Sequence, residues 1–350
     1  MLSMHESQWR ELLSLGLERL PHALLLTGAA GLGKRQFADQ LVRLMLCERI
    51  VTSGLVPSCC GDCDGCRWLA SSSHPDVRYV SPDNDDGDDA EAVSNSAEGK
   101  GAEAAAPSSI KAKPKKRANS SIKVAAIRAL EEFVFVGSHR QGRRVIFVTD
   151  ADAMNNIAAN ALLKVLEEPP ANVYFILITS RPDRLLRTLR SRCRQLGFVR
   201  PQPAAAIDYL RSLGLPKGSE ALLALAGGAP LQVARWHETG QIDGLKTLLQ
   251  TFQNPGTNPL ILAGRWDDLL KKDGNLRMEF LVEAVQRWTV DAALKSSAQL
   301  DSGAFGGWRG LLQCRRAATH PLNQLLFLEE LASHAMRATG KLTSQQRVMA

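Results

Sequence analysis

A glycine-rich stretch between a short apolar run and an amphipathic segment constrains the fold of this chain more than any other feature. Residues 28–34 read Gly-Ala-Ala-Gly-Leu-Gly-Lys and match the first seven positions of the phosphate-binding pattern G-x-x-x-x-G-K. Residues 22–27 before them are mostly apolar, and residues 34–47 after them carry apolar side chains at helical spacing. The order predicts a strand, a loop whose backbone N–H groups surround phosphate oxygens, and a helix. The candidate phosphate-binding residues are Gly28, Gly31, Gly33 and Lys34.

The pattern departs from an active ATP site at two places. Its eighth position should be Ser or Thr, which binds Mg²⁺ through a hydroxyl, but the residue is Arg35. The strand predicted at residues 145–149 should end in a metal-binding Asp followed by a Glu, but Thr149 and Asp150 stand there. If Asp150 is instead the metal-binding residue, Ala151 replaces the catalytic acid. We therefore predict absent or negligible hydrolysis and weak or absent ATP binding.

The remaining pattern of apolar residues predicts a parallel α/β sheet followed by helices. The runs at 145–149 and 173–179 are typical of strands buried on both faces, and a helical pattern at 156–168 lies between them. After Pro201 only helical patterns follow. We predict three domains: an α/β domain at 1–200, with a zinc-binding insert at about 47–66 and a disordered insertion at about 82–120, a small helical lid at 201–238, and a helical domain at 239–350.

Cysteines close together in the sequence predict a metal site. Cys60, Cys63 and Cys66 follow the spacing Cys-x2-Cys-x2-Cys, and a tetrahedral zinc site needs a fourth ligand. Cys47 and Cys59 both qualify, and Cys47 is preferred because adjacent cysteines rarely ligate one ion comfortably. The loop around them is polar and has little core of its own, which favours structural Zn²⁺ over free thiols or a redox pair.

A cluster of arginines follows the run at 173–179. It comprises Arg181, Arg184, Arg187, Arg190, Arg192 and Arg194. From these residues alone, a solvated basic surface explains the cluster as well as a functional one. Four further segments carry a resemblance: HPD at 74–76, NALLKVLEEPP at 160–170, LRSRC at 189–193 and HPLNQLLFLEEL at 320–331.

With these segments, the chain outside residues 82–120 resembles the AAA+ clamp-loader family, and within it the delta-prime subunits of bacterial DNA polymerase III. The resemblance implies an AAA+ module of two domains and a helical collar that assembles into a ring. It implies that Arg192 acts catalytically, as a finger on the ATP of a neighbouring subunit. Thr179 then takes the sensor-1 place, and Leu231 stands where active subunits have the sensor-2 arginine. The implied partners are the delta subunit, tau or gamma ATPase subunits, the beta sliding clamp and primed DNA.

Two other functions remain open at this point. One is an active ATPase subunit of the tau or gamma type, against which Arg35, Thr149 and Leu231 argue. The other is a zinc-containing nucleic-acid-binding protein, with which the net charge of +7 is compatible. The sequence has no secretory signal pattern and no apolar run long enough to span a membrane, so we expect a cytoplasmic protein without a membrane partner.

Overall fold

The computed structural model describes most of the chain in two compact units, Met1–Val199 and Arg200–Ala350. The described residues are 5–14, 16–52, 57–82, 121–135, 142–215, 219–255, 258–272, 276–295, 302–318 and 323–340. The predicted insertion at 82–120 lies, except for its first residue, outside the described residues. Each unit has a hydrophobic core of its own.

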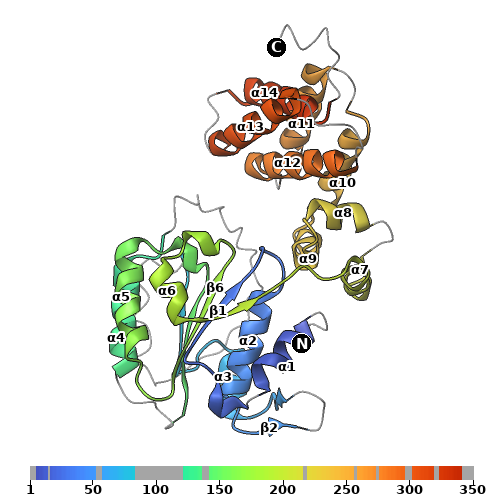
Figure 1. The fold of residues 1–350 in the computed structure, drawn as a ribbon. Coiled ribbons are helices and arrows are strands. Elements are labelled where there is room, and N and C mark those ends of the chain that lie inside the picture. Colours follow the sequence, from blue (N-terminus) through green and yellow to red (C-terminus); the bar gives the residue numbers. More distant parts are fainter. Residues whose placement is uncertain are drawn as a thin grey trace, which may run out of the picture. The chain divides into compact units, whose positions relative to one another are not determined.

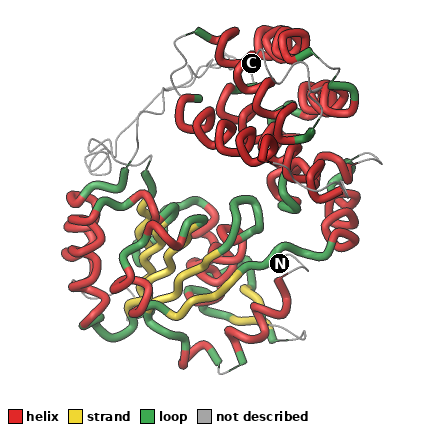
Figure 2. The backbone as a smooth tube through the Cα atoms, turned by 45° about the horizontal axis from the view of Figure 1, so that its top comes forward, coloured by secondary structure: helices red, strands yellow, loops and turns green. Residues whose placement is uncertain are grey.

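The first unit is built on one parallel sheet of five strands in the order β4-β5-β6-β1-β7. Figure 2 shows this sheet with helices on both sides. The strands are β1 (Ala23–Thr27), β4 (Val77–Val80), β5 (Arg144–Val148), β6 (Val173–Thr179) and β7 (Arg194–Gly197). A parallel sheet with flanking helices and a helical C-terminal part confirms the predicted fold class.

The central strands are buried on both faces, as their continuous apolar sequences require. Every residue of β5 is buried, and Leu25 and Leu26 of β1 are fully buried although they point to opposite faces. Helices α4 (Val124–Phe135) and α5 (Asn156–Glu167) cover one face, and α2 (Lys34–Met45) covers the other (Figure 1). The glycine-rich loop follows β1, Thr149 follows β5, and Thr179 ends β6.

Local signals set the ends of α5. Its N-cap Asn155 accepts a 2.8 Å hydrogen bond from the Ala158 backbone N–H, which satisfies one of the free donors of the first turn. The helix ends at Glu167, just before Pro169 and Pro170, because proline cannot continue a helix. This rigid end places Glu167 at the edge of the first unit near α6 (Arg187–Arg192).

The remaining elements of the first unit are short. They are α1 (Glu6–Leu13), the antiparallel pair β2 (Ile50–Val51) and β3 (Ser58–Cys59), α3 (Asp64–Ala70) and three 3-10 turns at Leu17–Arg19, Ala151–Ala153 and Pro182–Arg184. The pair β2 and β3 leads from the end of α2 to α3 and brings distant cysteines together.

The second unit is helical throughout its described part. Its helices are α7 (Pro203–Ser212), α8 (Ser219–Leu225), α9 (Pro230–Glu238), α10 (Ile242–Gln253), α11 (Pro259–Lys272), α12 (Met278–Lys295), α13 (Ser302–Ala317) and α14 (Gln324–Ala338). One hydrophobic core extends from Ala206 to Ala338 and includes Trp236 and Trp266. The division between lid and collar at residue 238 therefore stays a prediction.

The helices of both units are short or interrupted by polar residues. Among the helices of the described ranges, none is long and apolar enough to cross a bilayer.

Candidate functional site

The predicted phosphate-binding loop connects β1 to α2 and has the backbone that its glycines allow. Gly28 and Gly33 have φ angles of 144° and 87°, which side-chain-bearing residues rarely adopt. A Cβ atom at Gly28 would lie 2.5 Å from the carbonyl oxygen of Phe198, so the close approach of these two segments also requires glycine. The loop is thus positioned by the sheet and by its own glycines.

Lys34 points back into this loop. Its Nζ donates hydrogen bonds to the carbonyl oxygens of Gly28 at 2.6 Å and Ala29 at 2.7 Å, and to Ser180 Oγ at 3.3 Å. Only 5% of the residue is exposed, and burial lowers the pKa of Lys34 to about 8, although Asp150 and Asp152 favour its charged form. The lysine is therefore engaged by the protein itself, and a nucleotide phosphate would have to compete with these contacts.

The residues that depart from an active ATP site line a neighbouring cavity of about 470 Å³. Arg35 lines it together with Thr149 and Asp150, which follow β5. The Thr149 hydroxyl donates to the carbonyl oxygen of Val80 at 3.4 Å. A guanidinium cannot coordinate Mg²⁺, so Arg35 cannot supply the hydroxyl ligand that the sequence pattern has at this position.

The sequence interpretation missed Asp152, a buried carboxylate beside this loop. Its Oδ1 accepts a 2.7 Å hydrogen bond from Thr179 Oγ1, and its Oδ2 accepts a 2.8 Å bond from Arg181 Nε. The Arg181 backbone N–H in turn donates to Thr179 Oγ1 at 3.0 Å. The predicted sensor residue Thr179 is thus held by a side chain of the same chain. The signal in the sequence was a second aspartate shortly after a buried strand.

We expect Asp152→Ala to lower the free energy of unfolding by about 1–3 kcal/mol, the usual cost of leaving a buried donor without a partner. The Thr179 hydroxyl is completely buried and would lose its acceptor, whereas exposed Arg181 would return to water. Urea unfolding measures the difference. Asp183→Ala is the matched control, because Asp183 is exposed in the next turn and should change stability by less than about 0.5 kcal/mol.

The same contact makes a pH prediction for Asp152→Asn. Although burial favours the neutral acid, the hydrogen bonds of Thr179 and Arg181 hold the pKa of Asp152 below its usual value of 3.8. The carboxylate therefore stabilises the fold fully above pH 3.8 and less as the pH falls through the lower, folded-state pKa. The difference in the free energy of unfolding between the wild type and Asp152→Asn should therefore shrink as the pH falls through that pKa. A difference that stays constant down to the lowest pH would contradict this prediction.

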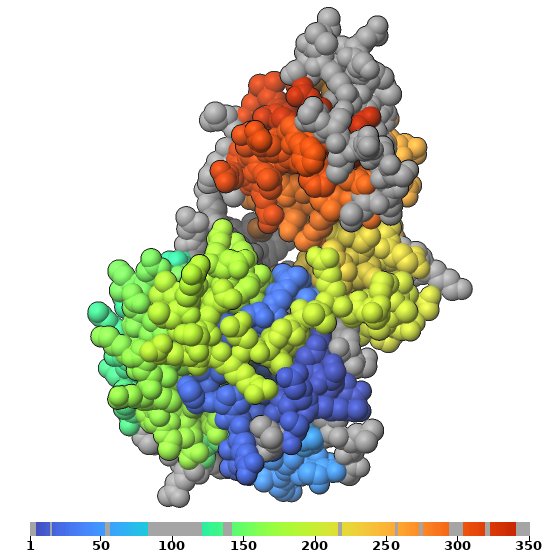
Figure 3. Space-filling model, viewed as in Figure 1, coloured from blue at the N-terminus to red at the C-terminus, as the bar shows by residue number. Residues whose placement is uncertain are grey.

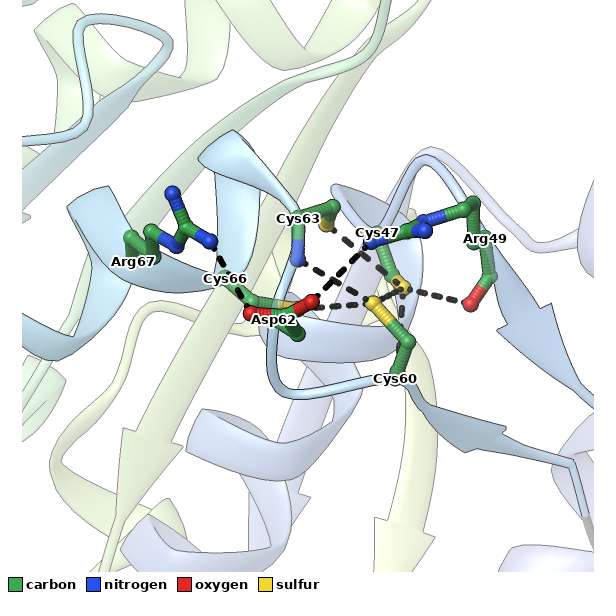
Figure 4. Close-up of polar contacts among 7 residues, drawn as sticks. All are labelled: Cys47, Arg49, Cys60, Asp62, Cys63, Cys66 and Arg67. Carbon is green, nitrogen blue, oxygen red and sulfur yellow. Dashed lines mark hydrogen bonds and ion pairs between the residues drawn. The ribbon is translucent and has the colours of Figure 1, made fainter.

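Four cysteine sulfurs meet where the end of α2, the β2–β3 pair and the start of α3 come together (Figure 4). Cys47, Cys60, Cys63 and Cys66, here named the four-cysteine group, have all their Sγ atoms within 4.8 Å of one another. The Cys47–Cys60 distance is 3.6 Å, and the Cys60–Cys66 and Cys47–Cys63 distances are 4.0 Å. Cys59 does not belong to this group, although it is adjacent to Cys60 in sequence.

The four-cysteine group fits a tetrahedral zinc ion. Zinc–sulfur bonds of about 2.3 Å place tetrahedral sulfurs about 3.8 Å apart, close to these three sulfur–sulfur distances. Hydrogen bonds from the Asp62 and Cys63 backbone N–H groups lower the pKa of Cys60 to about 6, whereas burial raises the pKa of Cys47 and of Cys66, so a metal would have to displace the protons of these two thiols. Arg49 and Arg67 pair with Asp62 beside the group and tie its loop together. These residues have the donor set and spacing of a structural zinc site.

Arg192 ends helix α6 and is exposed. Its Nη2 lies 2.6 Å from Glu167 Oε1 at the end of α5, and about half of each side chain is accessible to water. The segment that carries it, yellow-green in Figure 3, lies on the surface of the first unit, while Leu189 and Cys193 are buried below. The core therefore fixes the helix and leaves the guanidinium available to another molecule.

Comparison with known proteins identifies relatives of this chain. A family model described as "DNA polymerase III, delta subunit" matches residues 6–202. A protein from Pseudomonas aeruginosa called DNA polymerase III subunit delta' is 35% identical over 259 residues, which cover 71% of this chain and 66% of the relative. Its Escherichia coli counterpart of the same name is 32% identical over 253 residues, which cover 71% of this chain and 63% of the relative.

The match therefore spans slightly less than two thirds of the length of these relatives. Among solved structures, a gamma subunit-related protein of DNA polymerase III from Thermotoga maritima aligns over 96% of this chain and 100% of its own, with 16% identity and a TM-score of 0.45. That value is too low to bear on function. Because the family model covers more than half of the sequence, the chain belongs to the DNA polymerase III delta-subunit family, alongside relatives called subunit delta'.

Proposed function

We propose that this chain serves as a delta-prime-type subunit of a DNA polymerase III clamp loader. In this role it does not hydrolyse ATP itself, but helps to load the beta sliding clamp onto primed DNA within a ring that contains the delta and tau or gamma subunits. Family membership and the names of the curated relatives support the assignment to the polymerase III assembly. A relative called DNA polymerase III subunit tau is 29% identical over 52% of the chain, and this similarity supports a relationship to the ATPase subunits.

The observation that carries the proposal is the contrast between an impaired phosphate site and an exposed arginine. At the chain's own site, Arg35 replaces the hydroxyl ligand of Mg²⁺ and Lys34 is bound to loop carbonyls. Arg192, the middle residue of the Ser-Arg-Cys segment, ends α6, and 40% of its side chain is open to solvent. These two features together suit a subunit that acts on a neighbour's ATP.

A guanidinium is well suited to that action. It is always charged, planar and able to donate two parallel hydrogen bonds, so it stabilises the charge that develops on a transferring phosphoryl group. Arg192 would have to leave Glu167 to reach a neighbour's ATP. Since exposed ion pairs contribute about 0–1 kcal/mol, this exchange costs little.

Zinc has a structural role in the proposal. The four-cysteine group would hold one Zn²⁺ with all four positions filled by thiolates, which leaves no open position for catalysis. The ion would stabilise the segment between α2 and α3, in whose described part Ile50 and Val51 are exposed. Weak nucleotide binding through Gly28, Gly31, Gly33 and Lys34 is compatible with this role.

We expect the isolated chain to show no ATP turnover above background, because both metal binding and water activation are impaired. A phosphate-release assay with Mg²⁺ tests this. Arg35→Ser should leave turnover at background, since it restores the hydroxyl but Thr149 still lacks a carboxylate. Mg²⁺-dependent turnover that Lys34→Ala abolishes would instead identify an active ATPase.

Reconstitution tests the proposed function as a whole. The chain is mixed with delta, the tau or gamma ATPase, the beta clamp and primed DNA, and clamp loading is measured with and without it. Loading that depends on the chain supports the proposal. Tight, salt-sensitive DNA binding by the chain alone, with no effect on loading, would favour a nucleic-acid-binding protein.

A further inference from the structure

A second group of metal-binding side chains lies in the helical second unit, apart from the four-cysteine group. Cys314 on α13 and Glu330 and His334 on α14 each place one donor atom within 4.8 Å of the others. Glu330 and His334 are one helical turn apart and face the same side of α14. Thiolate, carboxylate and imidazole are the three side-chain donors that zinc binds in proteins.

Two glycines on α13 make room for this arrangement. A Cβ atom at Gly307 would lie 2.7 Å from the carbonyl oxygen of His334, and one at Gly310 would lie 2.2 Å from two atoms of the His334 ring. Gly310 is one turn before Cys314 on α13, so the His334 ring packs against α13 close to the Cys314 thiol. The close packing of α13 and α14 thus depends on glycines at the positions that bring the donors together.

The donors of this group are poorly satisfied by the protein. His334 Nδ1 is buried and has no hydrogen-bond partner among the described residues. His334 Nε2 lies 3.5 Å from Glu330 Oε1, longer than a good hydrogen bond. Buried polar atoms in native proteins are nearly always paired, so the imidazole of His334 can ligate an ion without giving up a good hydrogen bond.

Charge and access also suit a divalent cation. Burial raises the pKa of Cys314 to about 11, so a cation would have to displace the thiol proton; the thiolate and Glu330 would then offset the two charges of the ion. The neighbouring cation Arg315 is directed toward Glu283 on α12, with a closest distance of 3.9 Å. Cys314 is 2% exposed, whereas 58% of the Glu330 side chain is exposed, which leaves an entry path from solvent.

We propose that Cys314, Glu330 and His334 form a second zinc site that links α13 to α14. Bonds of about 2.0–2.3 Å would draw the donors to about 3.3–3.8 Å from one another, which needs small movements of side chains whose donor atoms now lie within 4.8 Å of one another. Three protein ligands leave the fourth position to water. The site does not depend on the clamp-loader role or on zinc in the four-cysteine group.

The test is a titration of the reduced, metal-free full-length chain with Co²⁺, followed by displacement with Zn²⁺. Co²⁺ gives sulfur-to-metal absorption that grows with the number of thiolates, so a four-thiolate site and a one-thiolate site have different spectra. We expect two equivalents to bind. Cys63→Ser should retain one equivalent with the weak one-thiolate spectrum, and His334→Ala should retain only the strong four-thiolate spectrum.

Milder variants guard against misfolding. Glu330→Gln keeps the size of the side chain and should weaken the second site at least about tenfold, the loss typical even of an outer partner of a metal ligand. Glu329→Gln changes the adjacent carboxylate, which is outside the group, and should bind as wild type. Circular dichroism verifies that each variant is folded.

Some outcomes would overturn the second site. These are a folded Cys63→Ser protein that binds no Co²⁺, or folded His334→Ala and Glu330→Gln proteins that bind as wild type does. If the four-cysteine group binds no metal, the wild type should bind one equivalent and His334→Ala none. The two sites are thereby tested independently.

Discussion

Arg192→Ala should lower ATP hydrolysis at the neighbouring subunit's site by about 10³- to 10⁵-fold, the usual contribution of an arginine finger. The loss is measured in a reconstituted ring whose other ATP sites have been inactivated, by single-turnover hydrolysis with clamp and primed DNA. In a ring with all sites intact, total hydrolysis should fall by a modest fraction, because the other sites keep their own arginines. Clamp loading should fall further, since it needs the sites to act together.

Two further variants separate catalysis from charge. Arg192→Lys should restore little activity, because an ammonium group lacks the planar two-pronged geometry. Arg187→Ala is the matched control, since Arg187 is exposed on the same helix α6 and its loss changes the surface charge equally. A ring with Arg192→Ala that hydrolyses ATP and loads clamps normally would remove Arg192 from the mechanism. A ring that fails to assemble would instead make Arg192 an interface residue.

Cys63→Ser should release the zinc ion of the four-cysteine group and destabilise the first unit by several kcal/mol. Structural zinc contributes on the order of 10 kcal/mol to the folding of small zinc domains, and the loss of one of four thiolates weakens binding of the ion. Metal analysis of protein purified without chelator measures the ion. Hydrogen exchange should show faster opening at residues 47–70, and thermal unfolding should shift downward.

Cys59→Ser is the matched control for this prediction. Cys59 is adjacent to Cys60 but outside the sulfur group, so its loss should leave the zinc in place. Loss of zinc from Cys59→Ser together with its retention in Cys47→Ser would make Cys59 the fourth ligand. Wild-type protein without metal at this group would remove the site altogether.

Long, strongly patterned segments were readable from the sequence. The apolar runs at 22–27 and 173–179 became β1 and β6, and the helical pattern at 156–168 became α5 within one residue. These elements are buried on both faces or carry a broad apolar side, so their sequences show the pattern of their surroundings. Strand β7 was missed, since its sequence RQLG has a single buried residue, Leu196.

The edge position of β7 explains why it was missed. It pairs with β1 alone and is half solvated, so its place in the sheet comes from backbone hydrogen bonds that any sequence can make. The short pair β2 and β3 was missed for the same reason, since both residues of β2 are exposed. Strands held mainly by backbone pairing leave little trace in the order of side chains.

The sequence by itself determined the phosphate-binding loop and the three closely spaced cysteines, because both depend on residues only a few positions apart. The sequence favoured Cys47 over Cys59 as the fourth sulfur, and the structure places Cys47 in the sulfur group. Only the tertiary structure turned Lys34 onto the loop carbonyls and placed Asp152 against Thr179. The Asp152–Thr179 contact joins the segment after β5 to the end of β6, and its distance is set by the order of strands in the sheet, which spacing along the chain does not encode.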